Sequence, residues 1–156
     1  MAKPNLFLID SIRKAARNIE NGSRYEWGHM GNCNCGNLAQ VVCKLDNNVI
    51  HQYAMQGAGD WSEQTMTYCE DSGLPFDIMV SELLNAGLDL TDLKHLEKLS
   101  DKRVLEKIPF EERNLSHNVK KDVVRYMYTW ASVLEEELIE KIELNIQFKE
   151  LVEVGQ

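Results

Sequence analysis

A histidine and two cysteines lie close together in a glycine-rich stretch of the chain, residues 27–38. Cys33 follows His29 by four positions, and Cys35 follows two positions later. Glycine reaches backbone conformations that other residues avoid, so the three glycines of this stretch predict a tight loop that turns these side chains toward one point. Imidazole and thiolate are ligands that zinc accepts. We therefore predict a metal or thiolate site, with zinc as the candidate metal.

A structural zinc site needs a fourth protein ligand, whereas a catalytic site holds water in that position. Four side chains elsewhere are candidates: His51, Cys69, Glu70 and His117. We select Cys69, because the predicted helix over residues 60–69 ends there beside a turn. The predicted ligand set is therefore His29, Cys33, Cys35 and Cys69. An iron–sulfur cluster is less favoured, because it normally requires four cysteines in closer groups.

Two alternatives to the metal site remain open. Cys35 at the first turn of a helix is placed like an activated nucleophile, with His29 or His117 as its base, and a redox pair of Cys33 and Cys35 is a related option. The helix N-terminus favours a thiolate, so we expect a low pKa for Cys33 or Cys35 and faster alkylation there than at Cys43. In the second alternative the loop only turns the chain and its cysteines fill space. The sequence leaves open whether the protein is an enzyme.

The N-terminal residues do not form a signal peptide, because Asp10 interrupts a short apolar run and no cleavage site follows. We therefore expect a cytoplasmic protein whose four cysteines are thiols or metal ligands rather than structural disulfides. Residues 27–40 resemble the signature of a bacterial family, and that resemblance implies no activity and no role for any residue.

The composition indicates one globular domain over residues 1–156, with 44% hydrophobic and 27% charged residues. The 25 acidic residues exceed the 17 basic ones, for a net charge of −8. A chain with this charge repels a phosphate backbone, so the sequence argues against a nucleic-acid partner. It also holds no run of about 18 apolar residues, so we expect no membrane span.

Apolar residues recur at helical spacing along most of the chain, which predicts an all-α domain of about six to seven helices. The first covers residues 5–20 and the second follows the glycine-rich loop, with its two cysteines at the N-terminus. Residues 49–56 form a third short helix, or a strand. The longest helix runs to about residue 141 and is capped by Ser116 or Asn118.

The C-terminal tail has a different pattern, since Ile142, Leu144, Ile146 and Phe148 alternate with polar residues. This period is typical of a half-buried strand, although the helix could continue with an irregular apolar stripe. The chain offers the strand no internal partner, so we expect pairing with another subunit in a homodimer. A non-catalytic helical interaction module is thus a further alternative to a metal site.

Overall fold

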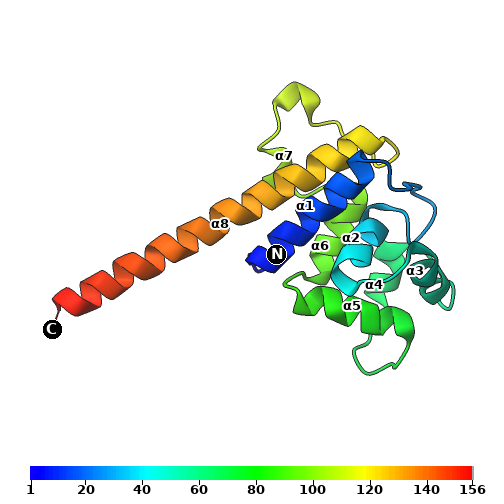
Figure 1. Ribbon diagram of the computed structural model, residues 1–156, viewed down its shortest axis with the longest axis horizontal. Coiled ribbons are helices and arrows are strands. Elements are labelled where there is room, and N and C mark those ends of the chain that lie inside the picture. The colour runs from blue at the N-terminus through cyan, green and yellow to red at the C-terminus, as the bar shows by residue number, and fades with distance from the viewer. Residues whose placement is uncertain (156) are drawn as a thin grey trace.

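The computed structural model describes residues 1–155, which fold into helices and contain no strand (Figure 1). The prediction of an all-α fold is confirmed. In chain order the elements are α1 (Leu6–Glu20), α2 (Asn34–Cys43), α3 (Asn47–Ala54), α4 (Trp61–Met66), α5 (Pro75–Asn85), α6 (Leu90–Lys98), α7 (Lys102–Leu105), a 3₁₀ turn η1 (Phe110–Glu112) and α8 (Lys120–Val154).

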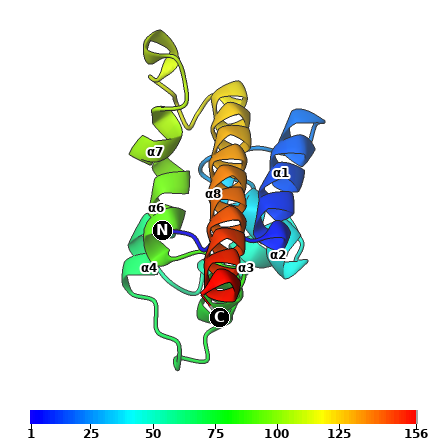
Figure 2. The same cartoon turned by 90° about the vertical axis from the view of Figure 1, so that its left-hand side faces the viewer.

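Helix α2 lies at the centre of the body and contacts α1, α3, α5 and α6. Its first six residues are buried, and five of them are small or polar (Asn34, Cys35, Gly36, Asn37 and Ala39). The N-terminal half of α8 packs between α1 and α7 (Figure 2). The glycine-rich loop therefore leads directly into the helix at the centre of the body.

The N-terminus of α8 is not capped by the residues that the sequence predicts. Val119 occupies the N-cap position and makes no side-chain cap hydrogen bond. Instead, the backbone N–H of Ser116 donates to Asp122 Oδ2 at 2.9 Å. The prediction that Ser116 or Asn118 caps this helix is wrong, because an acidic side chain of the first turn reaches back to the preceding segment.

Helices α1 and α8 are antiparallel, and two side-chain contacts fix their register. Tyr128 Oη donates to Glu20 Oε2 at 2.8 Å, and Arg13 Nη1 donates to Glu135 Oε2 at 2.6 Å. The two contacts are seven residues apart on both helices, so α1 begins about level with Ile142. Beyond that level α8 continues to Val154 and projects about 20 Å from the body (Figure 1).

The projecting tail continues α8, so of the two predicted alternatives the strand is wrong and the continued helix is confirmed. Residues 142–154 contain no glycine or proline and are rich in good helix formers such as leucine, glutamate and lysine. A step of two residues turns a helix by about 200°, so alternating apolar residues fall on opposite faces. The sequence alternation therefore produces two apolar stripes, one with Ile142 and Ile146, the other with Leu144 and Phe148.

Within residues 1–155, no helix combines the length and the apolar character that crossing a membrane requires.

Candidate functional site

The glycine-rich loop is closed by backbone contacts that only glycine permits. A Cβ atom at Gly31 would lie 1.8 Å from the carbonyl oxygen of Asn47, and one at Gly36 would lie 2.4 Å from that of Met30. The loop also forms turns of its own, since the N–H of Cys33 donates to the carbonyl of His29 at 3.0 Å. These glycines therefore serve backbone packing against α2 and α3.

Both loop cysteines are buried, and their sulfur atoms contact different partners. Cys33 Sγ accepts from the N–H of Gly36 at 3.4 Å, which makes Cys33 the N-cap of α2. Cys35 Sγ donates to the carbonyl of Leu93 on α6 at 3.3 Å. Burial raises the pKa of Cys33 to about 12 and raises that of Cys35 as well. The expectation of a low pKa is wrong, because desolvation outweighs the helix N-terminus.

His29 pairs with another histidine rather than with the cysteines. Its ring stacks on His51, with 4.0 Å between ring centroids and 18° between planes. Nδ1 of His29 accepts from the N–H of Gly31 at 3.1 Å, and Nδ1 of His51 accepts from that of Met30 at 3.2 Å. Burial and the neighbouring His51 lower the pKa of His29. The sequence did not predict this histidine pair, in which both rings accept hydrogen bonds from backbone N–H groups of the loop.

The other ligand candidates lie apart from the loop cysteines. Cys69 and Glu70 are exposed in the segment between α4 and α5, and His117 packs at a tilt against Trp27, with 4.2 Å between ring centroids and 33° between planes. In the described part of the chain, no group of three or more His, Cys, Asp or Glu side chains is placed to hold a metal ion. The zinc site therefore stays a prediction without support from this geometry.

The asparagines of the loop bind backbone carbonyl groups. Asn34 Nδ2 donates to the carbonyls of Leu96 at 2.7 Å and Glu97 at 3.1 Å, at the end of α6. Asn37 Nδ2 donates to the carbonyls of Asn32 and Cys33 at 2.7 and 3.0 Å. Asn34 thus fixes α2 to α6 and Asn37 fixes α2 to the loop, whereas the buried Nδ2 of Asn32 has no hydrogen-bond partner among the described residues.

A cavity of about 210 Å³ lies beside this loop. Two tryptophans, two methionines and two carboxyl residues line it, together with two glycines: Trp27, Gly28, Met30, Met55, Gly59, Asp60, Trp61 and Glu97. Glu97 is only 3% exposed, and its Oε2 accepts from the N–H of Ser62 at 2.7 Å. Burial, and then the nearby Asp60 carboxylate, raise the pKa of Glu97 to about 7. Sequence reasoning missed Glu97, because a lone glutamate beside Leu96 carries no pattern that reveals burial.

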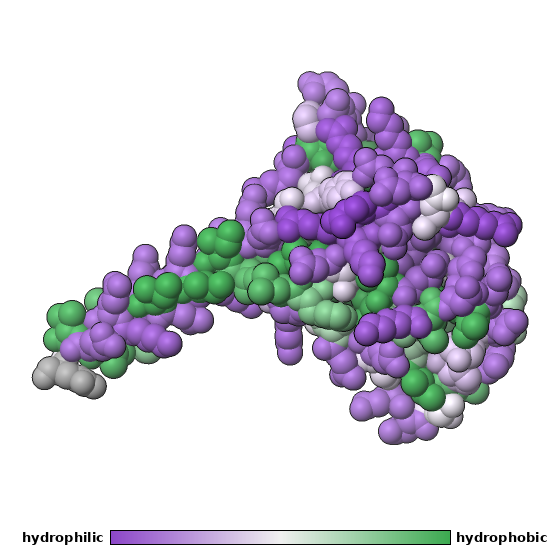
Figure 3. Space-filling view, in the orientation of Figure 1, coloured by the Kyte–Doolittle hydropathy of each residue, from purple (hydrophilic) through white to green (hydrophobic). Residues whose placement is uncertain are grey.

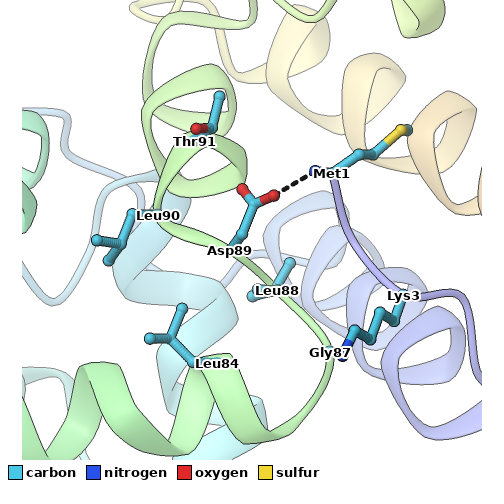
Figure 4. Close-up of a pocket in the computed structure, with 8 residues that line it drawn as sticks. All are labelled: Met1, Lys3, Leu84, Gly87, Leu88, Asp89, Leu90 and Thr91. Carbon is cyan, nitrogen blue, oxygen red and sulfur yellow. Dashed lines mark hydrogen bonds and ion pairs between the residues drawn. The ribbon is translucent and has the colours of Figure 1, made fainter. Parts of the chain in front are cut away.

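A larger hollow of about 580 Å³ opens between the N-terminal segment and the start of α6 (Figure 4). Asp89 dominates its polar lining, pairing with the N-terminal ammonium group and accepting from the N–H of Asp92 at 2.8 Å. The N–H of Asp89 in turn donates to the Asp92 side chain, which completes a capping box. The carboxylate here therefore already serves the fold.

The projecting part of α8 exposes large apolar side chains on both of its stripes. Figure 3 shows hydrophobic residues, in green, along the face of this helix that it presents. Phe148 is 68% exposed and Leu144 63%, and Leu151 extends their stripe by one turn. Where α8 leaves the body, the start of α1 also exposes Leu6 and Phe7. Large exposed apolar patches mark interaction sites, so this region is the second candidate site.

No protein-family model, no curated protein and no solved structure matches this chain. The resemblance of residues 27–40 to a bacterial signature therefore stays a prediction. A function has to be inferred from the geometry of the loop, the cavity and the projecting helix.

Proposed function

We propose that this protein is a helical association module whose α8 tail, residues 139–154, binds a second copy of the chain in an antiparallel arrangement. The observation that supports it is a projecting helix with apolar stripes on opposite faces. A solitary helix of this kind leaves both stripes in water. Each large apolar side chain that a partner covers contributes about 1.5–3 kcal/mol.

The area of the tail favours a partner that covers both stripes. Sixteen helical residues form a cylinder about 24 Å long and 10–12 Å wide, with a lateral surface of roughly 750–900 Å². A partner on one stripe covers about half of this, whereas a stable interface buries about 800 Å² on each side. A simple pair of tails, joined by one stripe, is therefore too small.

An antiparallel second copy supplies the missing contact. In that arrangement the tip of each tail reaches the place where the other tail leaves its body. Leu6 and Phe7 are exposed there, about level with Ile142. One stripe of each tail then packs on the other tail, and apolar side chains near its tip, such as Leu151, pack on the start of the other α1. The two contacts are equivalent by two-fold symmetry, so the assembly closes as a dimer.

Charge distinguishes a second copy from a basic partner. Each copy carries a net charge of −8, and residues 139–154 hold four glutamates against two lysines. Two copies therefore repel at long range, and salt should strengthen their association by screening. Binding of a basic partner to the same acidic tail would weaken with salt.

The experiment compares one substitution in each stripe with a matched control on a polar face. Ile146→Glu and Phe148→Glu each place a charge in a stripe, whereas Gln147→Glu adds the same charge between them. Since a symmetric dimer contains each substitution twice, either stripe variant should cost about 3 kcal/mol or more, a roughly 100-fold increase in the dimer Kd. Light scattering across a dilution series, at low and high salt, measures it.

The control variant should remain dimeric with nearly the wild-type Kd. A wild-type chain that is monomeric at every concentration would overturn the proposal. So would a dimer whose Kd is unchanged by both stripe variants.

A further inference from the structure

We propose that the cavity beside the glycine-rich loop binds a small organic cation, an alkylammonium group, with Glu97 as its counter-ion. This site is separate from the α8 tail, because its lining comes from the loop, the end of α3, the start of α4 and the end of α6. The proposal therefore stands or falls independently of the dimer.

The buried carboxyl group of Glu97 lacks a counter-ion within residues 1–155, where it forms no salt bridge. Its Oε2 accepts from the N–H of Ser62, which leaves Oε1 for a ligand. Three charged side chains influence it from the elements around the cavity: Asp60, Glu63 and Lys98. Two of these are acidic, so the surroundings of Glu97 favour a positive ligand.

The single nearby lysine is engaged elsewhere. Lys98 Nζ lies over the Trp27 ring, 5.2 Å from its centroid. This is the geometry of a cation–π contact, so a ring that lines the cavity already attracts a cation.

The lining favours an organic cation over a metal ion. Besides the two carboxyl residues, the walls are formed mainly by Trp27, Trp61, Met30 and Met55. Metal ions need several nitrogen, oxygen or sulfur ligands, and the described residues group no such set. Alkylammonium groups instead combine a diffuse charge with apolar surface, which aromatic and thioether walls accommodate. At about 210 Å³ the cavity suits a small ligand.

The proton competes with such a ligand for Glu97. With a pKa of about 7, the carboxyl group is mostly protonated at pH 6 and mostly ionised at pH 8. Since a cation pairs with the ionised form, its affinity should rise about tenfold from pH 6 to pH 8.

Choline and its neutral isostere 3,3-dimethylbutan-1-ol are matched probes, because they differ in one charged atom. Titration of the full-length protein, followed by tryptophan fluorescence, should give saturable binding of choline at pH 8 and weak binding of the alcohol. Glu97→Gln should weaken choline binding at least tenfold and remove its pH dependence. Glu70→Gln, which removes an exposed carboxylate outside the cavity lining, should change affinity less than threefold.

Equal binding of the two probes, or no saturable binding of choline at pH 8, would overturn the inference. Because Glu97 is buried, the far-UV circular dichroism of Glu97→Gln has to match that of the wild type. If that variant unfolds, the pH series on the wild type decides: an affinity that does not rise between pH 6 and pH 8 refutes the role of Glu97. The dimer variant Phe148→Glu should bind choline normally, which separates this site from the tail.

Discussion

Gly31 lies where two backbone segments meet, and its lack of a side chain is what lets them touch. Because a Cβ atom there would lie 1.8 Å from a backbone oxygen of Asn47, Gly31→Ala has to push α3 away from the loop. We expect a loss of about 2–3 kcal/mol in the free energy of unfolding, at the upper end of overpacking costs. Urea denaturation measures it.

Gly28 is the matched control for this prediction, since nothing lies within 4 Å of a Cβ atom built there. Gly28→Ala should leave the free energy of unfolding within about 0.5 kcal/mol of the wild type or raise it slightly. A Gly31→Ala protein as stable as Gly28→Ala would show that the loop does not pack against α3 as described.

The cysteines should react in an order set by exposure. Cys69 is exposed, Cys43 is partly buried, and Cys33 and Cys35 are buried with a raised pKa. Iodoacetamide at neutral pH should therefore label Cys69 first and the two loop cysteines last, as read by peptide mass. Labelling of Cys33 or Cys35 before Cys69 in folded protein would contradict their burial and restore the case for a reactive thiolate.

At the scale of single elements, helices with local signals could be predicted from the sequence. The first helix was expected over residues 5–20, and the structure gives Leu6–Glu20, because Asn5 caps it through the N–H of Leu8 and Gly22 follows its end. The start of α8 could not be predicted in the same way. Its stabilising contact joins Asp122 to the backbone of Ser116, which is no standard cap.

The tail shows why periodicity alone did not decide between helix and strand. A period of two gives one apolar face on a strand but two opposite faces on a helix. The sequence could therefore reveal an unpartnered apolar tail without revealing its geometry. In the structure the tail continues α8, so it presents two apolar faces of a helix rather than one edge of a strand. The tail therefore fits a different kind of partner than the predicted strand would.

The candidate site was located by residue type, but burial decided its chemistry. His29 lies in the loop, Cys33 at the N-cap of α2 and Cys35 in its first turn. The sulfur atoms contact backbone groups and the imidazole stacks on His51. The sequence carries no measure of desolvation, so it could not show that the thiols stay protonated. Glu97 was missed for the same reason, because burial gives an ordinary glutamate its raised pKa.

The whole molecule combines a packed body with a helix that extends beyond it (Figure 1). The body buries its apolar residues in one cluster that includes α1, α2, α5, α6 and the first half of α8. The second half of α8 adds nothing to that core, since residues 139–154 are all exposed. Its apolar residues are thus free for association, and the antiparallel dimer is the central inference about this protein.

Distances between spin labels on the two tails test this inference most directly. Labels are introduced by Gln147→Cys, near the middle of the tail, or Glu153→Cys, near its tip, each in a Cys69→Ser background. The antiparallel dimer predicts a short distance between the two labels at position 147. The labels at position 153 should lie roughly 15 Å apart along the helix axis. Short distances at both positions would indicate a parallel pair, and the absence of dipolar coupling at both would indicate a monomer; either result would contradict the antiparallel dimer.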